Sequence, residues 1–414
     1  MQKKVLVLGV GQHNFLFYLY SALKSYNSSY TIAAPFVKEL DKSVKSDSSI
    51  YNNELVSQKV SLLNTVKALF LLLFDGFLYQ TFFFILFVEG KFKKAVHFVI
   101  KLMQVKAFFL QNDDFADFDT FHFHYLQYSY VRELFLVPKG KKIVCSFWGS
   151  DLLRTADILN LYIIKKALNK ATYITCQSLE LKEIVLSKYG RHLEDKIKVV
   201  MFPIDTKTYN AIDLYQNNHE AISVFRETYG YSKDKINVLI GHNGSPFNNH
   251  NKIIEALSQL QQKEKIHLIV NLNYGIQELD KAAYKAKLTQ ALQTSGISFV
   301  VLENFFANDE LAISRLASDI FIHMPISDAL SGTMLEMLYA GNTVITGAWL
   351  PYKTFVNAGL KYHEVPDFSK LATKLDAILY QFEAEKASAQ QNKQAIQNAF
   401  FGESIVSHWN QILN

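Results

Sequence analysis

Two acidic residues flank a run of small residues between positions 325 and 347. Asp328 and Glu336 stand eight positions apart, and the small residues Ser331, Gly332 and Thr333 lie between them. The free N–H groups of a helix start attract phosphate oxygens. The pattern therefore predicts an anion-binding helix start with two carboxylates beside it.

The residues on either side predict the elements that position this loop. An apolar strand over 319–324 precedes it, a helix over 333–339 follows, and a second apolar strand begins at Thr343. Such a unit places the loop at the carboxyl edge of a parallel sheet, where open α/β sheets bind ligands. The ordinary alternative is a crossover whose acids are simply solvated.

A second loop has the composition of a phosphate cradle. A strand over 236–240 leads into the segment GHNGSPFNNHNK, and a helix over 253–262 follows. Backbone amides and small polar side chains in such a loop can surround an anion.

The first half of the chain carries three further loops of interest. A strand over 4–10 ends in the turn Gly9-x-Gly11, with His13 beside it. A strand over 120–125 carries His122 and His124 on one face; this pair could hold a metal, but no third ligand is evident, and no metal site is predicted. Position 13 could equally be a helix cap or a surface histidine.

A strand over 142–147 delivers Trp148 and Asp151 into the next helix. The ordinary interpretation of Asp151 is a cap of that helix.

The composition indicates two α/β domains. The chain has 414 residues, 49% of them apolar, which allows two cores of ordinary size. Cys145 and Cys176 lie in apolar runs and are expected to be buried thiols in a reducing compartment. Residues 1–210 hold 27 basic and 18 acidic residues (+9), and the remainder holds 16 and 20 (−4). The first half could therefore face an anionic surface.

Residues 59–110 combine apolar runs with lysines. Asp75-Gly76 interrupts the longest run, which predicts two short helices, and a third helix carries Lys91, Lys93 and Lys94 among large apolar residues. We expect these helices to lie in a membrane interface. Plain core helices and a true membrane span are the alternatives.

The stretch 325–347 resembles the donor-binding segment of GT-B glycosyltransferases, above all glycosyltransferase family 4. That family has a Glu-x7-Glu pair around a Gly-rich turn; here the pair is Asp328-x7-Glu336, with Ser331-Gly332 in the turn and Ala340-Gly341 before the strand. The resemblance implies an α/β GT-B fold, with two Rossmann-like domains facing a central cleft.

The segment 241–252 lacks the Arg and Lys that family 4 enzymes usually have there. It resembles instead the corresponding loop of the Fuc4NAc transferases of enterobacterial common antigen assembly. The resemblance implies a donor-binding set in this segment: His242, Gly244, Ser245, Asn248, His250 and Lys252. Lys252 would supply the replacement charge.

The resemblance also implies roles for single residues. Amides of residues 331–333 would stabilise the leaving diphosphate, Glu336 would hold ribose hydroxyls and Asp328 would touch the sugar. Gly11 would approach the sugar through its backbone.

Retention of configuration, which is slightly favoured, requires no side-chain base. Inversion would need one, with Asp151, His13 or His124 as candidates. No metal or cofactor is expected.

We expect an acceptor-binding domain over 1–205, a linker over 206–234, a nucleotide-sugar domain over 235–390 and a C-terminal segment, 391–414, that returns to the first domain. The predicted function is sugar transfer from a nucleotide sugar to a lipid-linked or glycan acceptor in cell-surface polysaccharide biosynthesis. The enzyme would lie at the inner face of the cell membrane and have no nucleic-acid partner. A catalytically inactive GT-B subunit is the alternative, and a nucleotide-sugar epimerase is a further one.

Overall fold

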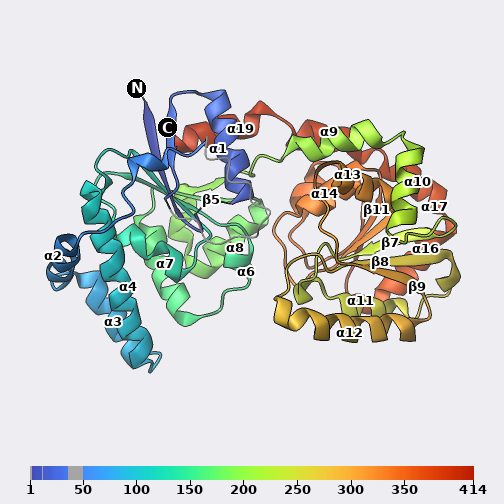
Figure 1. Cartoon of the computed structure of the whole chain (residues 1–414), viewed down its shortest axis with the longest axis horizontal. Helices are drawn as coiled ribbons and strands as arrows, with labels where there is room; N and C mark the ends of the chain where they lie inside the picture. Colours follow the sequence, from blue (N-terminus) through green and yellow to red (C-terminus); the bar gives the residue numbers. More distant parts are fainter. Residues whose placement is uncertain (1, 12, 36–49) are drawn as a thin grey trace. The chain divides into compact units, whose positions relative to one another are not determined.

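The computed structural model describes residues 2–11, 13–35 and 50–414, and the chain forms two compact units. Unit 1 comprises Met1–Pro203 and Glu403–Asn414, and unit 2 comprises Ile204–Gly402. Each unit has its own parallel sheet between layers of helices (Figure 1).

The linker expected over 206–234 is instead two helices of unit 2. They are α9 (Thr206–Tyr215) and α10 (His219–Thr228). Asp205 caps α9 at the amide of Lys207, and Asn218 caps α10 at the amide of Ala221. The segment looks like a linker because its buried apolar residues are few: Tyr209, Ala211 and Ile212 in α9 and Phe225 in α10.

Unit 1 has a six-stranded parallel sheet in the order β2-β1-β3-β4-β5-β6. The strands are β1 (Lys3–Gly9), β2 (Tyr30–Ala33), β3 (Thr120–His124), β4 (Lys142–Ser146), β5 (Tyr173–Cys176) and β6 (Ile197–Val199). Strand β2 lies on one side of β1, whereas β3 and the later strands follow on its other side, so the order of the strands reverses between β1 and β3. Loops that follow these two strands therefore meet at a switch point, where open α/β sheets form ligand crevices.

Helices cover both faces of this sheet. They are α1 (Asn14–Tyr26), α5 (Tyr128–Val131), α6 (Ser150–Leu153), α7 (Ile158–Lys170), α8 (Leu179–Tyr189) and α19 (Glu403–Leu413). The last of these comes from the far end of the chain and packs beside α1 (Figure 1). Trp409 of α19 is buried in the unit 1 core.

Three helices between β2 and β3 form an apolar projection of unit 1. They are α2 (Leu62–Leu72), α3 (Gly76–Phe87) and α4 (Phe92–Gln111). Asp75 separates the first two and caps α3 at the amide of Leu78. Among the described residues no single helix is long and apolar enough to cross a membrane; α2 and α3 meet the criterion only together, bent by 74°.

Unit 2 has the strand order β12-β11-β10-β7-β8-β9, again all parallel. The strands are β7 (Ile236–Ile240), β8 (Ile266–Asn271), β9 (Ser298–Leu302), β10 (Ile320–His323), β11 (Thr343–Gly347) and β12 (His363–Val365). This is the doubly wound order, and its switch point lies between β7 and β10.

The helices of unit 2 form two layers around this sheet. Besides α9 and α10 they are α11 (His250–Leu257), α12 (Glu278–Ser295), α13 (Asn308–Ala317), α14 (Gly332–Tyr339), α15 (Lys353–Asn357), α16 (Leu371–Tyr380), α17 (Phe382–Ala389) and α18 (Asn392–Phe400). Buried residues of α11, α12 and α16 form the core against one face of the sheet.

Candidate functional site

The loops after β7 and β10 meet at the switch point of unit 2, here called the β7–β10 edge. The first runs over 241–249 and leads into α11; the second runs over 324–331 and leads into α14. Asn249 joins them, because its side-chain amide donates to the carbonyl oxygen of Met324 (2.8 Å). The two segments that the sequence singles out in this half of the chain are therefore neighbours.

Asp328 is held by two side chains that the sequence analysis did not identify. Its Oδ2 accepts hydrogen bonds from His323 Nε2 and from the Tyr352 hydroxyl, both at 3.0 Å. Burial alone would raise the pKa of Asp328, but the hydrogen bond and charge of His323 outweigh it and lower that pKa. Asp328 is thus a carboxylate at neutral pH, with its orientation fixed.

The start of α14 presents backbone amides to the same edge. Ser331 caps the helix, and its hydroxyl accepts from the amide of Met334 (3.1 Å). The amides of Gly332 and Thr333 precede the first intrahelical bonds. No heavy atom lies within 4 Å of where a Cβ of Gly332 would be. An anion can therefore approach this helix start closely.

Glu336 lies one turn further along α14 and is paired with Arg315 of α13. The Nε and a terminal nitrogen of the guanidinium donate to Oε2, at 3.0 and 2.8 Å. The arginine is buried, and this carboxylate compensates the cost of burying its charge. Arg315 was missed by the sequence analysis because no motif links two residues 21 positions apart on different helices.

The loop over 241–249 is a closely packed turn. Gly241 has φ +67°, and a Cβ there would collide with Nε2 of His250. The side-chain amide of Asn248 donates to the backbone and side-chain oxygens of Asn243, at 3.0 and 2.8 Å. The amide of Gly244 donates to the carbonyl oxygen of Tyr274 (2.7 Å), which anchors the loop on the segment after β8.

Two residues of the expected donor set lie at the rim of this loop. Ser245 caps the short helical turn Pro246–Asn248 through the amide of Phe247. Lys252 lies in the first turn of α11 with its ammonium 5.6 Å above the ring of Phe368. The helix begins at His250, three residues earlier than expected, because Asn249 adopts the left-handed conformation that precedes it.

Four polar atoms near this edge are buried without a hydrogen-bond partner among the described residues. They are His242 Nδ1, Asn248 Oδ1, His250 Nε2 and His323 Nδ1. Native structures leave few such atoms unpaired, and those they leave call for a ligand, a water or a functional role. Burial, with a smaller contribution from neighbouring His323, lowers the pKa of His242 to about 3, and burial lowers that of His250 to about 4. Both rings are neutral at pH 7.

In unit 1, His124 and His122 belong to a buried hydrogen-bond chain. The indole N–H of Trp148 can only donate, and it donates to Nδ1 of His124 (3.3 Å). The direction is then fixed: His124 Nε2 donates to Tyr20 (3.0 Å), whose hydroxyl donates to His122 Nδ1 (2.9 Å). His122 Nε2 donates in turn to Ser146 Oγ (2.7 Å).

Every ring nitrogen of this histidine pair is therefore bonded. Burial lowers the pKa of His122 to about 3, and burial and its histidine neighbours hold the pKa of His124 well below the usual value. Neither ring is arranged as a metal ligand. Among the described residues no group of three or more His, Cys, Asp or Glu side chains could hold a metal ion.

Asp151 is buried and does not cap α6. Its Oδ2 accepts from the amide of Leu126 (2.7 Å), and its Oδ1 accepts from the amides of Trp148 (3.0 Å) and Gly149 (2.9 Å). Burial raises the pKa of Asp151 to about 6 in spite of these bonds. The side chain ties the loop after β3 to the loop after β4.

Gly11 and His13 lie at the same switch point of unit 1. Gly11 has φ +77°, which favours glycine. The half-buried His13 ring packs edge-on to Trp148, with 4.7 Å between ring centres. Burial lowers the pKa of His13 to about 4. The loops after β1, β3 and β4 thus form one aromatic, histidine-rich edge.

No protein-family model matches the sequence, and no curated protein matches it. Solved structures do match its fold. HepE of Anabaena, solved with UDP and glucose, has a TM-score of 0.64 at 14% identity, covering 100% of this chain and 99% of that one.

Two further structures agree over the whole chain. A glycosyltransferase from Rickettsia africae matches with a TM-score of 0.69 at 14% identity, covering 100% of this chain and 98% of its own. The sucrose-phosphate synthase of Thermosynechococcus elongatus matches with 0.67 at 13%, with the same coverage. At these identities the likeness concerns the fold: the chain has the two-domain α/β architecture of GT-B glycosyltransferases.

Proposed function

We propose that the protein is a glycosyltransferase that moves a sugar from a nucleotide-sugar donor to an acceptor. Unit 2 would hold the donor at the β7–β10 edge. The observation that carries this proposal is the set of four unpaired buried polar atoms beside the α14 start and Asp328. Proteins with a similar fold, such as HepE, have been solved with UDP and glucose, which supports a nucleotide sugar as the donor.

The chemistry follows from fixed dipoles. The amides of Gly332 and Thr333 would take the diphosphate oxygens, and the positive end of the α14 dipole would stabilise charge as the diphosphate leaves. Glu336 would accept from ribose hydroxyls through Oε1, because Arg315 occupies Oε2. Asp328 would orient the sugar, since His323 and Tyr352 fix its Oδ2.

Retention of the anomeric configuration is the outcome we propose. An inverting enzyme needs a base for the acceptor hydroxyl. Two of the three candidates for this base are already bonded: both oxygens of Asp151 accept backbone amides, and both nitrogens of His124 are bonded within the core. These side chains serve the architecture of the unit 1 edge. A product of inverted configuration, determined by NMR of the anomeric proton, would contradict this assignment.

The function is tested by incubating the protein with a panel of nucleotide sugars and measuring the released nucleotide. Stabilisation by UDP, measured as a shift in melting temperature, is recorded in parallel. We expect release with at least one donor and loss of release in Glu336→Ala. Stabilisation without release for any donor and acceptor would favour an inactive GT-B subunit. If the protein shows no stabilisation by UDP and no release of nucleotide, the donor site itself is contradicted.

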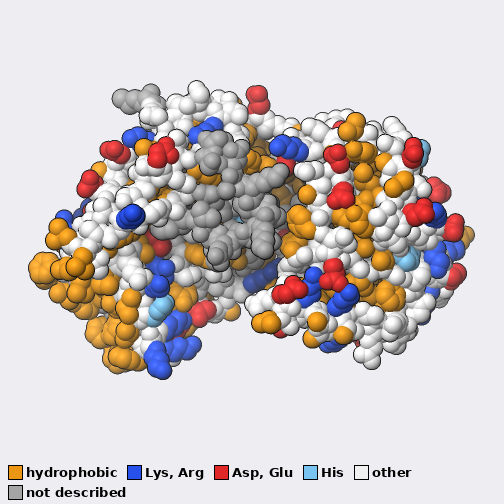
Figure 2. All heavy atoms as spheres, viewed as in Figure 1, with side chains coloured by type: hydrophobic (Ala, Val, Ile, Leu, Met, Phe, Trp, Pro, Cys, Tyr) orange, Lys and Arg blue, Asp and Glu red, His pale blue; other side chains and the backbone are white. Residues whose placement is uncertain are grey.

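We further propose that the acceptor is lipid-linked or a glycan of the cell surface, and that unit 1 binds the inner face of the cell membrane. The support is a large apolar patch on α2 and α3. It includes four side chains exposed by three quarters or more: Leu62, Leu63, Phe74 and Phe87. Lysine side chains border it (Figure 2). Soluble proteins rarely expose an apolar area of this extent.

The charge beside the patch selects an anionic surface. Lys67, Lys91 and Lys93 are exposed on or beside α2 and α4. Each lysine near an anionic bilayer contributes about 1 kcal/mol, which adds to the burial of the apolar side chains. Lys94 is a poorer participant, because it is paired with Glu89 at 2.8 Å.

Co-sedimentation with vesicles tests this membrane proposal. We expect binding to vesicles containing phosphatidylglycerol, weakened by high salt and by Lys67→Glu, Lys91→Glu and Lys93→Glu together. Phe74→Ser with Phe87→Ser should also weaken it. Lys265→Glu, Lys287→Glu and Lys370→Glu together, at three exposed lysines of unit 2, are the charge-matched control. A protein that stays in the supernatant at low salt would sink the proposal.

A further inference from the structure

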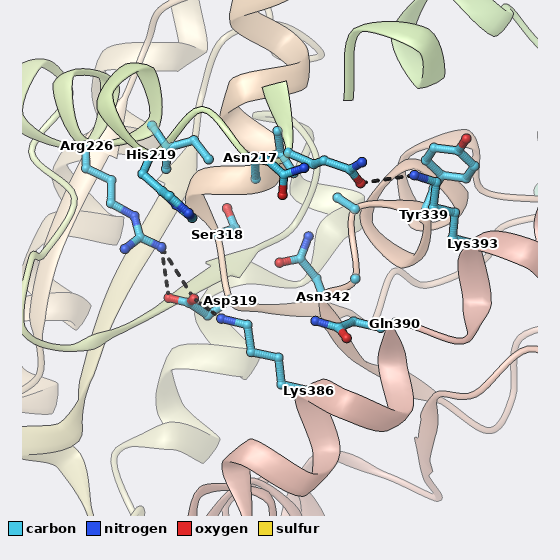
Figure 3. A pocket seen from close by; sticks show the side chains of 15 residues that line it. Asn217, His219, Arg226, Ser318, Asp319, Tyr339, Asn342, Lys386, Gln390 and Lys393 are labelled. Atoms are coloured by element: carbon cyan, nitrogen blue, oxygen red, sulfur yellow. Dashed lines mark hydrogen bonds and ion pairs between the residues drawn. The ribbon is translucent and has the colours of Figure 1, made fainter. Parts of the chain in front are cut away.

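A cavity of unit 2 lies at the edge of its sheet opposite to the β7–β10 edge. It has a volume of about 580 Å³ and is bounded by the segments that enter β10 and β11, by the start of α10 and by α17 and α18 (Figure 3). Since parallel strands place their amino ends at one edge, this cavity is separate from the candidate donor site. We call it the amino-end cavity.

The amino-end cavity has an excess of positive charge. Its lining contains Arg226, Lys386 and Lys393 but a single carboxylate, Asp319. Arg226 is used structurally, because it donates to the carbonyl oxygen of Ala317 (3.0 Å) and pairs with Asp319. Lys393 pairs with Asp213 at 2.8 Å.

Lys386 has the least neutralised charge of the three. Its ammonium lies 3.9 Å from Asp319, beyond hydrogen-bond distance, and its side chain is 47% exposed. It extends from α17 across the cavity (Figure 3). Asp319 is also shared, since it accepts from the amide of Asn237 and from Arg226. An anion in the cavity would therefore meet Lys386 first.

The rest of the lining suits hydroxyl groups. Four residues with side-chain amides line it: Gln216, Asn217, Asn342 and Gln390. Amides both donate and accept hydrogen bonds, as sugar hydroxyls do. Ile222, Leu316 and Ala340 add apolar surface to these walls.

We propose that the amino-end cavity binds a phosphorylated, hydroxyl-bearing metabolite of the sugar-phosphate class. Lys386 takes the phosphate, with Lys393 adding to the field, and the amide side chains take the hydroxyls. The site is an effector site, because it lies apart from the edge at which the donor would react.

A short chain of contacts connects this cavity to Glu336. The side-chain amide of Asn342, in the cavity wall, donates to the carbonyl oxygens of Arg315 (2.9 Å) and Met337 (3.1 Å). Arg315 in turn holds Glu336. The helix α14 itself runs from Ser331 at one edge to Tyr339 in the cavity wall. Ligand binding in the cavity should thus alter the N-terminal turn of α14.

Titration calorimetry at low ionic strength tests the site, with inorganic phosphate and glucose 6-phosphate as probes. We expect both to bind, glucose 6-phosphate at least tenfold more tightly. Lys386→Ala should weaken both at least tenfold, and Lys386→Arg should restore most of the affinity. Lys287→Ala, an exposed lysine on α12, is the charge-matched control and should change nothing.

Asn248→Ala distinguishes the two edges of the sheet. If phosphate binding is lost in Asn248→Ala and kept in Lys386→Ala, the anion sits at the β7–β10 edge and the proposal is overturned. Absence of binding to the unaltered protein overturns it too. The experiment uses no donor, so it does not depend on the glycosyltransferase proposal.

Hydrogen exchange of the α14 amides tests the link between the cavity and Glu336. The exchange should slow with glucose 6-phosphate, and unchanged exchange would overturn the link.

Discussion

At the residue scale, the most informative contact is the one between Arg315 and Glu336. A buried guanidinium next to a half-buried carboxylate costs desolvation, which the two hydrogen bonds to Oε2 offset. Within the described part of the chain no bond to Oε1 is found, so that oxygen can accept from a ligand hydroxyl. Glu336 therefore couples the stability of α13 and α14 to ligand binding.

Changing Glu336 should affect binding and stability in different proportions. Glu336→Gln removes charge-assisted hydrogen bonds to the donor, which costs about 1.5–3 kcal/mol of binding free energy. Glu336→Ala should lose more, because nothing remains to accept from the hydroxyl or to pair with Arg315. Calorimetric titration with UDP-glucose measures the binding loss and urea unfolding the stability loss. Glu383→Gln, exposed on α17, is the control; full activity in Glu336→Ala would contradict the assignment.

At the element scale, most strands could be predicted because parallel strands buried on both faces are continuous apolar runs. The runs at 236–240 and 142–147 match β7 and β4 to within a residue. Helices with few apolar residues could not be predicted in this way. α9 and α10 bury mainly Tyr209, Ile212 and Phe225, so their sequences resemble a linker.

The candidate site was predictable where a motif is local and not where it depends on packing. Asp328, Ser331 and Glu336 share one loop and helix, so their proximity follows from the sequence spacing. The partners His323, Tyr352 and Arg315 come from other elements, and their arrangement requires the fold. The hydrogen bonds that Asp151 and His124 make within the core also depend on packing between elements.

The contacts of the loop over 241–249 favour Asn248 over Lys252 as the residue on which UDP binding depends. The Lys252 ammonium lies over Phe368, whereas Asn248 Oδ1 is buried and unpaired within the loop. Asn248→Ala should weaken UDP binding at least tenfold, since it removes an acceptor for a ribose hydroxyl and the hydrogen bonds that hold Asn243. Lys252→Ala should change binding by threefold or less. The reverse order of effects, measured by calorimetry, would place the phosphates nearer to α11.

At the scale of the whole molecule, the chain buries several neutral histidines. The folded-state pKa of His122 is about 3, below the unfolded value of about 6.5. Its contribution to stability is therefore complete above pH 6.5 and is lost as the pH falls toward 3, at about 1.4 kcal/mol per pH unit. His122→Gln should flatten the dependence of unfolding free energy on pH by this amount between pH 6 and 4. Urea unfolding in a pH series measures it, with the exposed His408→Gln as control.

Glu133, also in unit 1, changes the free energy of unfolding with pH in the opposite direction to His122. Burial raises its pKa to about 7, so the folded state holds the proton more tightly than the unfolded state does. Its contribution favours folding below pH 4.5 and is lost as the pH rises through 7. Glu133→Gln should therefore stabilise the protein at pH 8 more than at pH 5. A pH dependence that changes in the same direction in His122→Gln and Glu133→Gln would contradict at least one of the two assignments.

The contact between Gly241 and His250 also limits the routes by which this chain can change over evolutionary time. A side chain at 241 would strike the histidine ring, and the backbone there has φ +67°. Removing the ring first relieves the collision but leaves Tyr284 without the partner that His250 Nδ1 provides at 2.9 Å. Substitutions at these three positions must therefore occur in a particular order, with 284 and 250 changing before 241. Related chains that carry a side chain at 241 should have a small residue at 250 and no hydroxyl at 284.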